Sequence, residues 1–105
     1  MTNKTALNSS ELKKALLQLE EIIPTIDKIG SGFESKETTA LALLLFFRER
    51  NVLDKLSFIR KVISLTLSKT LSDDEFQKLI ETDIDLWKPP YNKGANEISA
   101  LLDKI

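Results

Sequence analysis

The 105-residue chain lacks cysteine and histidine altogether, and it has only three glycines and three prolines. Without cysteine there is no disulfide, no thiolate metal site, no iron–sulfur cluster and no thiol nucleophile. Without histidine, catalysis that depends on an imidazole base is excluded, because no other side chain has an unperturbed pKa close to neutrality. We therefore expect a protein that is not an enzyme and that uses no metal and no cofactor.

Neither an excess of positive charge nor a long hydrophobic run is present. The chain has 15 basic and 16 acidic side chains, whereas nucleic-acid binding normally needs a surplus of lysine and arginine on one face, so we expect no nucleic-acid partner. The longest apolar run covers residues 40–47, and a transmembrane helix needs about 20 apolar residues. The polar first ten residues contain no signal-peptide core, which favours a cytoplasmic location.

Apolar residues recur at helical spacing through the first third of the chain. Residues 8–10 offer capping oxygens and Glu11 completes a capping-box spacing with Asn8, so we predict a helix from there and a flexible segment over residues 1–8. Pro24 removes one amide donor and predicts a kink or a break near Ile23. The glycines at 30 and 32 end the element. The apolar stripe consists of Leu12, Leu16, Leu19, Ile23 and Ile26.

Two further helices are predicted in the middle of the chain. Ser35 is a plausible cap for a helix that ends near Asn51 and is apolar on every side over residues 40–47, so we expect this helix to be the central element of the bundle. A buried strand is the alternative, and the absence of β-branched residues in this run speaks against it. The next helix should run from Val52 to about Lys69.

The last third begins with a capping box, Ser72 to Glu75, which is flanked by the spacing of a hydrophobic staple at Leu71 and Phe76. The helix that follows should end between residues 83 and 87. Residues 88–95 contain two prolines and predict an extended loop, after which a short helix begins near Asn96. We conclude that residues 1–105 form a single all-α domain, an up-and-down bundle of four main helices plus a short C-terminal helix.

Opposite charges follow one another along the second half of the chain. Residues 52–69 are mainly basic and residues 72–87 mainly acidic, so we expect the two groups to meet across their hairpin.

The acidic residues could also be imagined as ligands of Mg²⁺ or Ca²⁺, but they lack the spacing of a calcium loop. We interpret the first three as helix-capping charges and the others as a solvated face; these residues are Asp73, Asp74 and Glu75, and then Glu81, Asp83 and Asp85.

Two clusters are candidate partner-binding sites. Trp87, Pro89, Pro90 and Tyr91 combine large aromatic rings with prolines, a composition typical of a protein-binding anchor; alternatively, Trp87 and Tyr91 fold back to cap the open end of the bundle.

The second cluster is the pair Arg48 and Arg50 at the end of a helix. These cations are suited to an anion or a partner. Alternatively, they interact with the exposed carbonyls and the dipole of the last helical turn.

We hypothesise that the chain is a small, non-catalytic protein-interaction or regulatory module whose partner is a protein, and the apolar stripe of the first helix is also compatible with a homodimer. In size and helical architecture the chain resembles bacteriocin immunity proteins. This resemblance implies an alternative function, neutralisation of a toxic partner as an immunity or antitoxin-like protein, with residues 88–105 as the recognition region. A minimal enzyme that uses carboxylates or lysines is a second alternative.

Overall fold

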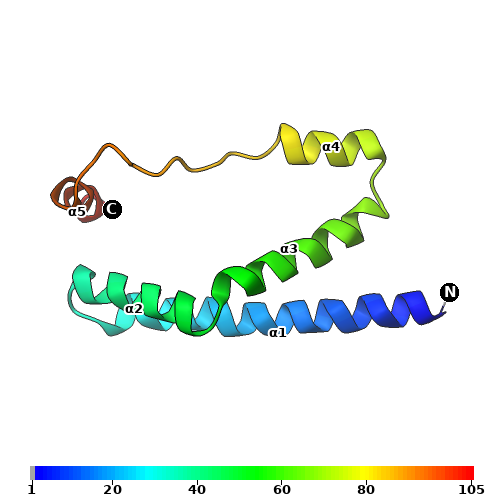
Figure 1. Ribbon diagram of the computed structural model, residues 1–105, viewed down its shortest axis with the longest axis horizontal. Helices are drawn as coiled ribbons and strands as arrows, with labels where there is room; N and C mark the ends of the chain where they lie inside the picture. Colours follow the sequence, from blue (N-terminus) through cyan, green and yellow to red (C-terminus); the bar gives the residue numbers. More distant parts are fainter. Residues whose placement is uncertain (1) are drawn as a thin grey trace.

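The structure is a computed structural model that describes the backbone of residues 2–105 and the side chains of residues 9–105. Every regular element in this range is an α-helix, and four main helices are followed by a short C-terminal one, which confirms the predicted fold class (Figure 1). The helices are α1 (Thr2–Gly32), α2 (Lys36–Glu49), α3 (Val52–Ser68), α4 (Asp73–Glu81) and α5 (Ala95–Asp103).

Helix α1 is longer and more continuous than the sequence indicates. It begins at Thr2, so the predicted cap at Asn8 lies inside the helix; of the segment predicted to be flexible, Met1 lies outside the described residues. The predicted break near Ile23 is wrong, because the helix continues through Pro24 to Gly32. Packing on both sides of the proline explains this: Ile22 is buried, and Ile29, two turns further on, packs against the same core.

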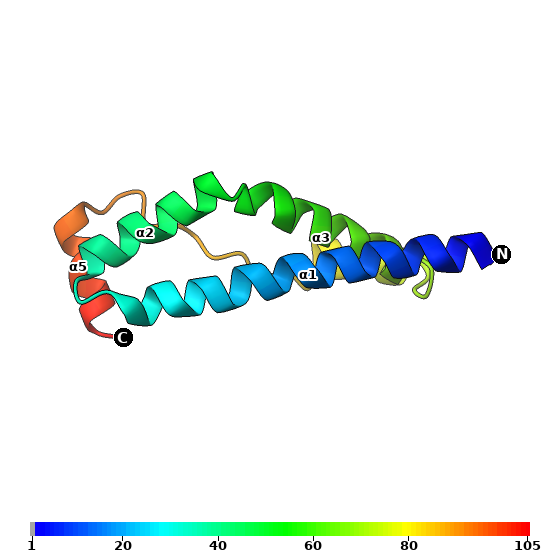
Figure 2. The same ribbon diagram turned by 90° about the horizontal axis from the view of Figure 1, so that it is seen from below.

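The core lies where α1 meets α3 and the end of α2. Six side chains of the described residues are buried in it, and they form one cluster. Helix α1 is the longest helix, and α2 and then α3 run back along it and pack against it (Figure 2). The ring of Phe58 is half-buried against the core, with the ammonium group of Lys14 4.8 Å from its centre. The buried residues are Ala15, Ile22, Phe46, Val52, Ile59 and Val62.

Helix α2 is not the central element that its composition predicts. Phe46 is its only buried residue, and Leu41, Leu44 and Leu45 are exposed. The reason is that α2 packs against α1 and α3, while α4 lies away from it and α5 reaches only its first turns (Figure 1). A helix that is apolar all round normally has neighbours all round, so α2 leaves apolar surface without a neighbour.

The charges of the core helices pair differently from the prediction. Glu21 of α1 accepts hydrogen bonds from the guanidinium group of Arg50, at 2.7 and 2.9 Å, and from Nζ of Lys55, at 2.5 Å. No ion pair in residues 9–105 joins α3 to the acidic residues of α4, so the expected pairing across that hairpin is wrong. The cations at the α2–α3 junction instead fix this junction to α1.

This ion-pair cluster predicts a pH dependence of stability. Hydrogen bonds from Lys55 and then Arg50 lower the pKa of the Glu21 carboxyl below its ordinary value of 4.5. A carboxylate with a lowered pKa stabilises the folded state above that ordinary value, and the contribution is lost as the pH falls below it. We expect Glu21→Gln to lower the free energy of unfolding at neutral pH and to have a smaller effect at acidic pH, as measured by urea unfolding at several pH values. An equal loss at every pH would contradict this account.

Helix α4 begins as predicted. The hydroxyl of Ser72 accepts from the N–H of Glu75 at 3.2 Å, and the N–H of Ser72 donates to the Glu75 carboxylate at 3.1 Å. The backbone N–H and the hydroxyl of Ser72 lower the pKa of Glu75. The helix ends at Glu81, before the predicted range, so the extended segment spans residues 82–94 and is longer than expected.

The extended segment and α5 form an arm that runs back over the core (Figure 1). Its end is held by Lys36 at the start of α2, whose Nζ donates to the Asp103 carboxylate at 2.7 Å and to the carbonyl of Ser99 at 3.2 Å. Ser35 caps α2 beside this contact, as predicted, by accepting from the N–H of Thr38 at 3.1 Å. The arm therefore connects to the other helices mainly at its two ends.

The molecule is elongated and open. It measures 55 × 29 × 20 Å, and its radius of gyration is 18.1 Å, against about 13 Å for a compact domain of this length. Its accessible surface is 9036 Å², whereas a compact monomer of this mass exposes roughly 5,900 Å². The chain by itself thus leaves much more surface in contact with solvent than a protein of its size normally does.

Candidate functional site

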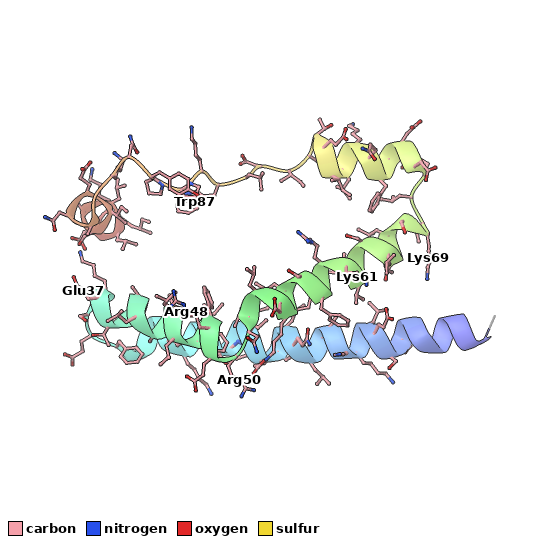
Figure 3. All side chains as sticks on the ribbon, viewed as in Figure 1. Glu37, Arg48, Arg50, Lys61, Lys69 and Trp87 are labelled. Carbon is pink, nitrogen blue, oxygen red and sulfur yellow. The ribbon has the colours of Figure 1, made fainter. Side chains whose placement is uncertain are left out.

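The arm places the aromatic cluster in solvent. The side chain of Trp87 is 79% exposed and that of Tyr91 is 87% exposed, so the alternative in which they cap the open end of the bundle is wrong. Trp87 lies on the extended segment between α4 and α5 (Figure 3). The chain's only tryptophan and only tyrosine therefore lie where a partner can reach them.

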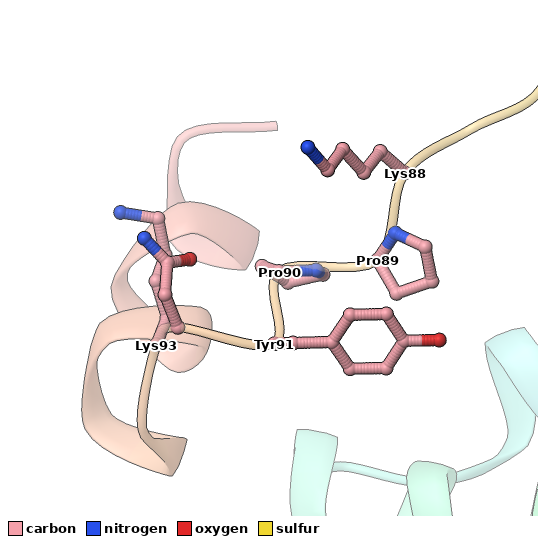
Figure 4. A pocket seen from close by; sticks show the side chains of 6 residues that line it. Lys88, Pro89, Pro90, Tyr91 and Lys93 are labelled. Atoms are coloured by element: carbon pink, nitrogen blue, oxygen red, sulfur yellow. The ribbon is translucent and has the colours of Figure 1, made fainter.

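Local hydrogen bonds shape the segment around the two prolines. The N–H of Tyr91 donates to the carbonyl of Pro89 at 2.9 Å, and the N–H of Lys93 donates to the carbonyl of Pro90 at 3.1 Å. These tight turns follow from the fixed φ angle of proline. The Tyr91 ring lies beside Pro89, and residues 88–93 enclose a hollow of about 500 Å³ (Figure 4).

A second hollow connects the tryptophan with α5. Its volume is about 370 Å³, and apart from Trp87 and Pro90 it is lined by the apolar side chains of the last helix. We call Trp87, Pro90 and Tyr91 together with these side chains the Trp87 surface. The residues contributed by α5 and the chain end are Ile98, Leu101, Leu102 and Ile105.

Two lysines, Lys88 and Lys93, line the hollow beside Tyr91. Lys88 lies next to Pro89, and in the described part of the chain no carboxylate pairs with it. Nζ of Lys93 lies 4.0 Å from the Glu97 carboxylate, a long and exposed ion pair that contributes little to stability. An apolar surface beside an unpaired ammonium group suits a partner that offers an apolar cleft with carboxylates at its edge.

The structure separates the two arginines that the sequence analysis grouped together. Arg50 points toward α1 and binds Glu21, so it has a structural role. Arg48 lies on the other side of α2, facing the arm, and lines a hollow with Phe47 and Leu53 rather than with Trp87 (Figure 3). Of the predicted site residues, Trp87, Pro89, Pro90 and Tyr91 lie near one another on the extended segment, where Pro90 lines both hollows, whereas the two arginines lie at the end of α2.

The sequence does not reveal the exposed apolar residues of α3, α4 and the chain just after α4. Leu53 is 74% exposed, and Leu56, Ile80 of α4 and Ile84 after it are exposed as well. The sequence contains one sign of this: the apolar residues of α3 cover more than the single stripe that one neighbouring helix can bury.

Other kinds of site have no counterpart in the described residues. Within residues 9–105 no three acidic side chains gather closely enough to hold a metal ion. None of the five helices has the length and the apolar character needed to cross a bilayer.

Comparison of the chain with protein-family models, with curated proteins and with solved structures finds no match.

Proposed function

We propose that the chain is a non-catalytic module that binds another protein through the Trp87 surface. The observation that carries this proposal is the exposure of the sole tryptophan and the sole tyrosine, four residues apart on a proline-stiffened segment. Tryptophan and tyrosine dominate the energetics of protein interfaces because each supplies a large rigid contact area. A small domain that keeps both out of its core loses the stability that their burial would provide.

The backbone of the segment supports the same function. Residues 82–94 form neither a helix nor a strand, and Pro89 and Pro90 restrict their conformations before any partner arrives. A preformed extended segment loses less entropy on binding than a flexible one. The expected partner is therefore a protein with an apolar groove for the rings of Trp87 and Tyr91 and with a carboxylate for Lys88.

Capture of partners from the native host by a tagged chain tests this proposal. We expect the variant that combines Trp87→Ala with Tyr91→Ala to lose the specifically captured protein, because truncation of one interface hot spot weakens binding by roughly 30-fold or more. Both side chains are exposed, so the free energy of unfolding should change by no more than about 0.5 kcal/mol for each substitution.

The matched control is Leu17→Ala on α1, a side chain that is 71% exposed and lies outside the Trp87 surface. This variant should capture the same protein as the natural chain. The proposal fails if the double variant is folded and captures the same proteins in the same amounts.

A further inference from the structure

Helix α5 is held to the other helices by side chains alone. It lies beside the start of α2 (Figure 2), but among the described residues none of its Cα atoms comes within 8 Å of another helix. Its polar contacts with α2 are the hydrogen bonds from Nζ of Lys36 to the Asp103 carboxylate, at 2.7 Å, and to the carbonyl of Ser99, at 3.2 Å. The Asp103 side chain is 68% exposed, and exposed ion pairs contribute little stability. The docked position of α5 therefore depends on a weak contact.

Helix α5 is also too short to be stable by itself. It has nine residues, whereas isolated helices shorter than about 12–15 residues are marginal in water. Asp103 is its last residue and places a negative charge at the negative end of the helix dipole, which is unfavourable. The ammonium group of Lys36 offsets this charge. Loss of Lys36 should consequently both free α5 from α2 and favour its unfolding.

The state of α5 determines whether the Trp87 surface is complete. Ile98 and Leu102 each line two hollows: one of about 330 Å³, which α5 shares with the start of α2, and the one that α5 shares with Trp87. Both hollows lose this wall when α5 unfolds. The contact with α2 is thus linked to the shape of the Trp87 surface.

We propose that Lys36 and Asp103 form an electrostatic latch that keeps α5 folded on α2 and thereby keeps the Trp87 surface complete. The effect of the latch on binding rests on the proposed function, whereas the latch itself rests on the contacts of α5. High ionic strength weakens the latch, because salt screens exposed charge pairs. The opened chain presents Trp87 without the apolar wall beside it.

Hydrogen–deuterium exchange of the full-length chain, measured over residues 95–105, tests the latch without any partner. Lys36→Met keeps the apolar stem that lines the hollow and removes the ammonium group, so α5 should exchange about two- to five-fold faster than in the natural chain. Lys36→Arg keeps the charge and should exchange like the natural chain. High salt should accelerate the exchange of α5 in the natural chain but not in Lys36→Met.

Glu37→Gln is the matched control for the exchange experiment. Glu37 lines the same hollow, but it belongs to none of the ion pairs in residues 9–105, so the exchange of α5 should stay as in the natural chain. Exchange of α5 that is equally fast in the natural chain and in Lys36→Met overturns the latch, whatever the capture of partners shows.

Capture of the partner tests the link to binding. Lys36→Glu places a carboxylate opposite Asp103, so we expect at least about two-fold less captured protein, because the binding-competent state is less populated. Adding Asp103→Lys restores the pair with reversed charges and should restore capture. Equal capture by folded Lys36→Glu overturns the link. Normal capture by the double variant of Trp87 and Tyr91 instead overturns the proposed function, and the exchange result still decides the latch.

Discussion

The replacement Ile59→Ala should lower the free energy of unfolding by about 2–5 kcal/mol, the usual loss for an isoleucine truncated in a packed core. Ile59 is 5% exposed and lies among the six buried residues that α1, α2 and α3 share. A domain of this length has only about 5–15 kcal/mol of stability in total. Since the buried cluster is small, one cavity in it removes a large part of what holds the three helices together.

Ile63, one turn further along α3, provides the matched control. It is 46% exposed, so Ile63→Ala removes the same atoms from a position that still contacts water. We expect a loss of about 1 kcal/mol or less. Both variants should be unfolded with urea at one fixed protein concentration, because the stability of an associating chain depends on concentration. Equal losses would show that the core lies elsewhere.

The replacement Pro24→Ala should have the opposite sign and stabilise the chain, by up to about 3 kcal/mol. Pro24 is exposed in the interior of α1, where it has no N–H to donate and where its ring crowds the carbonyl four residues earlier. Alanine restores the missing hydrogen bond without removing any buried contact. The expected result is a higher midpoint of urea unfolding with an unchanged slope.

Pro89→Ala is the control for this substitution, because Pro89 lies in the extended segment rather than in a helix. At this position the substitution raises the conformational entropy of the unfolded chain and removes no helix strain. We therefore expect the free energy of unfolding to fall by about 0.4–1 kcal/mol instead of rising. A Pro24→Ala variant that is no more stable than the natural chain would mean that α1 does not pass through residue 24 as a helix.

Local sequence features predict most of the helices. The cap at Ser35, the capping box from Ser72 to Glu75 and the start of α5 near Asn96 all depend on residues within one turn of each other, and the structure has these boundaries as predicted or within a residue. Such contacts are decided by neighbouring residues alone, so the sequence is sufficient to identify them.

Features that depend on distant parts of the chain were harder to predict. The continuity of α1 through Pro24 depends on packing against α3, and the exposure of α2 depends on where the arm runs. The pairing of Glu21 with Arg50 joins residues 29 positions apart, and no local pattern indicates it.

The candidate site shows the same limit. The sequence identified Trp87, Pro89, Pro90 and Tyr91 as unusual, but it left open whether the rings point inward or outward. The exposure of Leu53 and Leu56 on α3 was not identified at all, because their stripe is indistinguishable in sequence from one that is buried.

The central claim, that the chain keeps its aromatic anchor outside the core, is tested most directly by acrylamide quenching of tryptophan fluorescence. Trp87 is the only tryptophan, so the signal reports on this one side chain. We expect the folded chain, in the absence of any partner, to be quenched almost as efficiently as the urea-unfolded chain. A folded chain whose tryptophan is strongly protected from the quencher would contradict the account.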